Sequence, residues 1–162
     1  MLIKLQDGRP VAAADDYVKV ADEEALPLDG GVMLPFERFK AELEGLPNRR
    51  LAVVLEPDQA VEDLAPYISS VSVIALNFPK FRDGRQYSAA ALLRERYGYT
   101  GELRAVGEVL LEQGRYMARV GFDAFEPSDG TTAEQWAERV GSFRHVYQSA
   151  ADGRTPAYLE RA

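Results

Sequence analysis

The sequence predicts an α/β fold in which four consecutive strand–helix units form a sheet of parallel strands. Short runs rich in aliphatic and β-branched residues recur along the chain, and a helical pattern follows each of them. Strands separated by helices run parallel with right-handed crossovers. Two architectures satisfy this pattern, an open doubly wound sheet and a partial TIM-barrel-like sheet, because the chain is too short for eight units.

Each predicted element rests on its own local pattern. Leu51–Leu55 is a continuous apolar run, as expected of a strand covered on both faces. The next strand, Val71–Leu76, is rich in β-branched residues, and the last contains Ala124 and Phe125. The four expected units, strand then helix, are 51–55 with 59–67, 71–76 with 89–97, 103–106 with 108–120, and 124–125 with 133–140.

A short N-terminal hairpin and a helix precede these units. Met1–Leu5 and Tyr17–Val20 alternate apolar and polar residues, and a turn at Asp7–Pro10 separates them. A helix is expected to open at Leu34-Pro35-Phe36, with proline in its first turn. The 162 residues are expected to form a single domain, 1–162, with a 1–31 extension, a 32–147 core and a 148–162 tail.

Composition narrows the classes of function. The chain has no cysteine and a single histidine, His145, which argues against disulfides, thiolate metal sites and multi-histidine metal sites. Its net charge of −7 argues against general binding to nucleic acid or anionic membranes. The first residues contain no long apolar run, so neither a signal peptide nor a membrane span is expected, and we expect a cytoplasmic protein.

Ligands of parallel α/β folds gather at the carboxyl ends of the strands. Here those ends lie near Glu56, Asn77, Gly107 and Glu126. The long loop from Phe78 to Ser88 leaves the same edge and interleaves cations with aromatic rings. Ser88 is expected to cap the helix that follows, so the loop and the helix start predict an anion- or partner-binding site. Its candidate residues are Asn77, Lys80, Arg82, Asp83, Arg85, Tyr87, Ser88 and Gly107. The alternative is a solvated loop that turns at Asp83-Gly84.

Other polar residues are expected to brace this motif. On a helical wheel that starts at Ala89, Arg96 lies within the apolar stripe, where it needs a partner such as Glu102. Arg104 lies inside an apolar strand, and it either points to the ligand edge or pairs with a neighbouring carboxylate. Gln113 shares a helical face with apolar residues and is expected to be a hydrogen-bonded core amide.

No catalytic motif is evident. Glu56, Glu108 and Glu126 are carboxylates near strand ends that can act as a general acid or base, but their spacing singles out no pair. His145 and Trp136 are expected to be structural. Gly107 is a lone glycine at a strand–helix junction and does not make a dinucleotide fingerprint.

With these residues in view, residues from Val32 to Tyr147 resemble a bacterial family of uncharacterised proteins described as oxidoreductases of sulfite reduction. Members of that family often accompany an assimilatory sulfite or nitrite reductase hemoprotein. The resemblance is strongest over four segments, Phe81–Ser88, Leu92–Arg94, Gly98–Gly107 and Arg119–Phe125.

The resemblance implies a role in reducing sulfite to sulfide for cysteine synthesis, with the siroheme and the iron–sulfur cluster in the partner hemoprotein and no cofactor in this chain. It supplies no catalytic residues. Three hypotheses follow: an accessory subunit that docks to the reductase through Phe81–Arg104, a small (βα) enzyme that binds a sulfur oxyanion or a phosphorylated metabolite, and a non-catalytic structural protein.

Overall fold

The computed structural model describes residues 1–46, 49–141 and 145–160. The strands are β1 (Leu2–Gln6), β2 (Arg9–Ala13), β3 (Tyr17–Lys19), β4 (Gly31–Pro35), β5 (Leu51–Leu55), β6 (Val73–Phe78), β7 (Glu102–Gly107) and β8 (Ala124–Phe125). The α-helices are α1 (Phe36–Glu42), α2 (Val61–Leu64), α3 (Arg85–Ala91), α4 (Gly114–Arg119) and α5 (Ala133–Val140).

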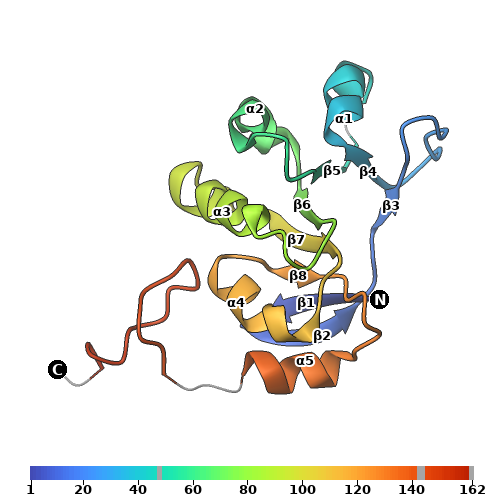
Figure 1. Cartoon of the computed structure of the whole chain (residues 1–162). Helices are drawn as coiled ribbons and strands as arrows, with labels where there is room; N and C mark the ends of the chain where they lie inside the picture. Colours follow the sequence, from blue (N-terminus) through green and yellow to red (C-terminus); the bar gives the residue numbers. More distant parts are fainter. Residues whose placement is uncertain (47–48, 142–144, 161–162) are drawn as a thin grey trace.

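In the described part of the chain, these strands form one eight-stranded sheet in the order β2-β1-β8-β7-β6-β5-β4-β3. The strands from β3 to β8 run parallel to one another. Strand β1 pairs antiparallel with both β2 and β8. The sheet curls into half of a barrel, with the helices outside the curl (Figure 1).

The strand order separates the two predicted architectures. A doubly wound sheet reverses its order at a switch point, but here each parallel strand lies beside the next one in the sequence, as in part of a (βα) barrel. Four strand–helix units do not account for the whole sheet, because β3 and β4 precede them. Strand β4 was not predicted, because its few apolar residues run directly into Pro35 and Phe36, which mark the start of a helix.

The predicted N-terminal hairpin has a different second strand. β1 pairs with β2 across a two-residue turn in which Asp7 and Gly8 have φ of 51° and 75°, the positive values that a tight hairpin needs. Pro10 is tolerated in β2 because this strand is at the edge of the sheet. Tyr17–Lys19 is instead β3, at the opposite edge beside β4.

The two faces of the sheet carry different cores. The outer face packs large residues, among them Leu34, Leu55, Phe78 and Phe125, against the helices in one buried cluster. The inner face is lined by the smaller cluster Met33, Ala52, Val73, Ala75 and Val106. Small inner side chains leave room for polar groups within the curl.

Helix α5 begins where the sequence predicts, because Thr132 and Gln135 form a reciprocal capping box. The predicted helix over 108–120 is shorter: a 3₁₀ turn over Leu111–Gln113 precedes α4. Among the described residues, no helix is long and apolar enough to cross a membrane.

Candidate functional site

The loop between β6 and α3, which we call the docking loop, leaves the carboxyl edge of the sheet. Lys80, Phe81 and Arg82 are exposed, and Phe81 keeps 40% of its surface accessible. Neither cation forms an ion pair within the described chain. The Phe81 backbone is held on both sides, because its N–H donates to Glu108 Oε2 and its carbonyl accepts from Gln113 Nε2 (3.4 Å). The loop therefore presents an aromatic ring between two cations on a fixed backbone.

Arg85 and Asp83 neutralise one another at the end of this loop. Arg85 donates from Nε to Asp83 Oδ1 (2.9 Å) and from Nη2 to Oδ2 (2.6 Å), and this guanidinium lowers the pKa of Asp83. Asp83 Oδ1 also accepts from the Arg85 N–H (3.3 Å), so the helix begins at Arg85. The prediction that Ser88 caps this helix is wrong: Ser88 is an exposed residue inside α3.

Tyr87 lies in an aromatic stack that leads from the core to the surface. Its ring centroid is 5.2 Å from that of Phe78 and 4.9 Å from that of Tyr116, which is 57% exposed. Burial raises the pKa of Tyr87.

Gln113 is buried and also accepts from the Leu110 N–H (3.0 Å), so it acts as a hydrogen-bonded core amide.

At the ends of β5, β6 and β7, Glu56, Asn77 and Gly107 meet. Asn77 Nδ2 lies 2.9 and 2.8 Å from the two carboxylate oxygens of Glu56, and it donates to that carboxylate. Gly107 has φ of 89°, and a Cβ there would lie 2.5 Å from Phe78 O. The absence of a side chain at Gly107 thus allows the end of β7 to pass close to the end of β6. This close approach helps to position the Asn77 amide, which in turn orients the Glu56 carboxylate.

Arg104 lies inside the curl with none of its surface exposed. Its guanidinium donates to Glu102 (2.8 Å), Asp15 (2.8 Å) and Glu126 (3.2 Å), and Glu102 also pairs with Lys4 (2.8 Å). Burial lowers the pKa of Arg104, but Asp15 and Glu102 outweigh it, so the pKa is raised. Nη2 of Arg104 has no hydrogen-bond partner among the residues that the structure describes. Of the two predicted alternatives for Arg104, the structure has the one with carboxylate partners.

Arg96 does not lie in the apolar stripe: it is exposed and stacks over Tyr97 at 5.7 Å. The prediction failed because Leu92–Arg96 is a π-helical turn, so a wheel drawn at 100° per residue loses register there. Arg94 takes the bracing role instead, donating to the carbonyls of Tyr99 (2.5 Å), Gly101 (2.9 Å) and Gly121 (2.9 Å) and to the Asp123 carboxylate.

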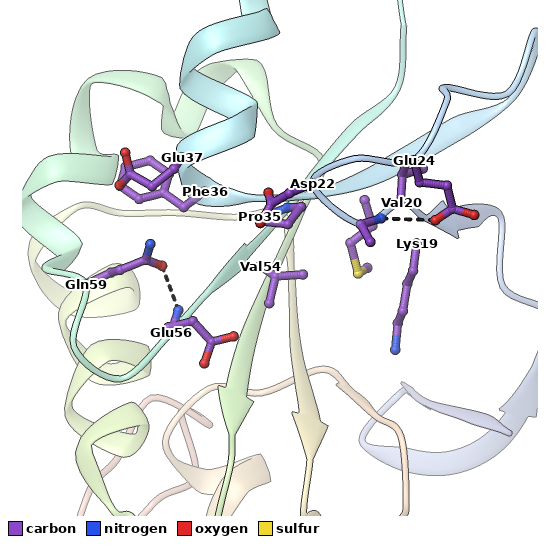
Figure 2. Close-up of a pocket in the computed structure, with 12 residues that line it drawn as sticks. Lys19, Val20, Asp22, Glu24, Pro35, Phe36, Glu37, Val54, Glu56 and Gln59 are labelled. Atoms are coloured by element: carbon purple, nitrogen blue, oxygen red, sulfur yellow. Dashed lines mark hydrogen bonds between the residues drawn. The ribbon is translucent and has the colours of Figure 1, made fainter.

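A cleft of about 540 Å³ opens at the carboxyl ends of β3, β4 and β5. Its floor is apolar, and Lys19 and Glu56 lie on either side of Val54 (Figure 2). Lys19 pairs with Glu126, which links the cleft to Arg104. The rest of its rim is acidic, with Asp22, Glu24 and Glu37.

The remaining candidates lie elsewhere. His145 Nδ1 is 2.6 Å from Glu160 Oε2 in the C-terminal segment, far in sequence from the loop. Trp136 is fully buried, stacks on Phe125 at 4.6 Å and donates to Thr131 (2.8 Å). Within the described residues, no group of three or more His, Asp or Glu side chains is arranged to hold a metal ion.

The structure therefore divides the predicted site. The loop cations stay at the surface, Glu56 and Asn77 meet at the cleft, and Arg104, Glu102 and Glu126 form an interior network. Sequence reasoning missed four participants: Lys4, Asp15, Lys19 and Arg94. A signal existed for Lys19, the charged residue in the alternating run that forms β3, but no local pattern shows that β3 lies beside β4.

Comparison with known protein families gives a match over most of the chain. The model of a family described as "Bacterial protein of unknown function (DUF934)" matches residues 52–158, which include β6 to β8, β5 apart from its first residue, the docking loop and Arg104. No curated protein and no solved structure matches the chain.

Proposed function

We propose that this chain, which belongs to the DUF934 family of bacterial proteins of unknown function, is an accessory protein for assimilatory sulfite reduction. In this proposal it docks to the sulfite or nitrite reductase hemoprotein through the docking loop. The siroheme and the iron–sulfur cluster belong to that partner. The sulfite link rests on the sequence resemblance over Val32–Tyr147, which is strongest over Phe81–Ser88, Leu92–Arg94, Gly98–Gly107 and Arg119–Phe125.

The observation that supports the docking role is that Phe81 combines an exposed side chain with a backbone held by hydrogen bonds. Glu108 and Gln113 hold its N–H and its carbonyl, so little conformational entropy remains to be lost when a partner covers the ring. Aromatic residues and arginine are enriched among the residues that dominate interface energies. Lys80 and Arg82 beside the ring favour a partner surface that is acidic.

The test is a binding measurement between the purified chain and the reductase hemoprotein from the same bacterium. The Phe81→Ala change is expected to weaken binding by about 2 kcal/mol or more if Phe81 is a central anchor. A Lys80→Ala/Arg82→Ala double variant should slow association and reduce its salt dependence.

The matched control is Lys40→Ala/Arg96→Ala, which removes the same charge outside the docking loop, from α1 and from the π-helical turn after α3. Equal loss of binding in both double variants would refute the docking surface. No binding by the wild-type chain would refute the accessory role itself.

A second candidate, a small enzyme, is favoured by Glu56, whose carboxylate is oriented by Asn77 beside the cleft. An oriented carboxylate in a cleft is a candidate general base. This candidate requires turnover by the purified chain alone, abolished in Glu56→Gln; an inert wild-type chain argues against it.

A further inference from the structure

A second pocket, of about 590 Å³, lies at the opposite edge of the sheet. It is formed where the end of β1, helix α4, the end of α5 and the C-terminal segment meet. Because β1 runs antiparallel to β8, this is the amino edge of the parallel strands, away from the docking loop. Three arginines line it: Arg115 and Arg119 from α4, and Arg154 from the C-terminal segment.

The surroundings of Arg115 are electrostatically unfavourable. Burial lowers its pKa, and the cations Arg119, Arg154 and Arg139 lower it further, against the opposing effect of Asp152. A guanidinium keeps its proton in proteins. The consequence is therefore a region of positive potential, in a chain whose net charge is −7.

Two of the arginines in this group lie at the C-terminal ends of helices. Arg119 and Arg139 lie in the last turns of α4 and α5, where the helix dipole favours a cation. Arg115 lies earlier in α4, after the 3₁₀ turn over Leu111–Gln113.

The C-terminal segment is held so that Arg154 joins this group. Arg119 donates to the Gln148 carbonyl, and its Nε lies 3.6 Å from Asp152 Oδ2. Asp152 Oδ1 accepts from the Arg154 N–H (3.2 Å), so this carboxylate is occupied in shaping the segment. Asp7 is the other carboxylate of the lining, and Leu5, Ala118 and Val140 supply its apolar part.

We propose that this pocket binds a small organic molecule through a tetrahedral oxyanion group, a phosphate or a sulfate. The guanidinium fork matches such an anion with paired N–H donors. The volume exceeds that of an inorganic anion and lies in the range of small-molecule sites, and the apolar wall contacts the organic part. The site is independent of the docking loop and of the proposed role in sulfite reduction.

The experiment measures binding by calorimetry and thermal shift on the full chain. The probes are inorganic phosphate, inorganic sulfate and adenosine 5′-monophosphate, with sodium chloride at matched ionic strength as the reference. Phosphate or sulfate should bind saturably beyond the chloride effect, and the monoester more tightly than either if the organic part contacts the wall. Arg115→Gln and Arg154→Gln should each weaken binding by about tenfold, whereas Arg96→Gln should not.

Stability without added anion separates a binding site from a structural cluster. Arg115→Gln removes one of the clustered cations, so its melting temperature in chloride is measured beside its anion affinity. A lower melting temperature, combined with unchanged anion affinity, would show that Arg115 only braces the fold. Saturable binding that is the same in both pocket variants and in the wild type, or no binding beyond chloride, also overturns the proposal.

Discussion

Among the cations of the segment from Lys80 to Arg104, two pairs differ in burial and in hydrogen bonding. Lys80 and Arg82 are exposed and have no ion-pair partner in the described chain. Arg94 and Arg104 are largely buried, and each has three or more acceptors. The same residue types thus serve two purposes within 25 positions of one motif.

The difference shows how far a motif can be interpreted without its environment. A buried guanidinium that donates most of its N–H groups to carboxylates and carbonyls of its own chain has few donors left for a partner protein. Its role is to hold those acceptors in place. An exposed cation contributes little to the free energy of unfolding. Beside an aromatic ring on a fixed backbone, it can instead raise the rate of association with an acidic partner surface. Resemblance over the whole motif therefore does not make each of its arginines a functional residue.

The largest effect is expected at Arg104. Arg104→Met removes the charge and leaves the carboxylates of Glu102, Asp15 and Glu126 without their shared partner inside the curl. Breaking a buried ion pair from one side typically costs about 3–5 kcal/mol. Urea denaturation should show this loss, whereas the exposed Arg96→Met control should stay within about 0.5 kcal/mol of the wild type. A small loss at Arg104 would mean that the network is not needed for stability.

Sequence periodicity predicted the central sheet well, because strands buried on both faces appear as short apolar runs. β5, β6 and β7 lie close to where the sequence placed them. It failed where the deciding contacts are non-local or the backbone is irregular. The pairing of β3 with β4 joins short segments that flank a loop, and the π-helical turn at Leu92–Arg96 shifts the helical wheel and exchanges the roles of Arg94 and Arg96.

The candidate site was harder to predict for the same reason. The loop residues and Glu56, Asn77 and Gly107 follow from the rule that ligands gather at carboxyl strand ends. The partners Asp15 and Lys19 reach the network because the curl of the sheet brings the β3 edge across from β7. A contact of that kind depends on the curl of the whole sheet, which no local sequence pattern predicts.

The pH dependence of stability gives a second, smaller test of the buried half. Tyr99 packs under Arg94, and burial raises its pKa above the usual value of about 10. In the unfolded chain Tyr99 ionises near pH 10, but in the folded chain it stays neutral to higher pH. Its contribution is therefore complete below pH 10 and is lost as pH rises, by up to about 1.4 kcal/mol per pH unit.

The measurement compares urea unfolding of the wild type and Tyr99→Phe at pH 9 and pH 11. The wild type should lose more stability between these two pH values than the variant, by about 1 kcal/mol. Equal losses would show that Tyr99 ionises alike in the folded and unfolded states.

The smallest effect on stability is expected in the exposed half. Lys80→Ala/Arg82→Ala removes two cations that have no ion pair within the described chain, while the contacts of Glu108 and Gln113 to the Phe81 backbone remain. Its free energy of unfolding should stay within about 0.5 kcal/mol of the wild type, as for most surface changes. A loss above about 2 kcal/mol would place these cations with Arg94 and Arg104 as structural residues, and any loss of reductase binding in this variant would then report unfolding. An unchanged stability makes the same variant a clean probe of docking, because the two halves of the motif can then be removed one at a time.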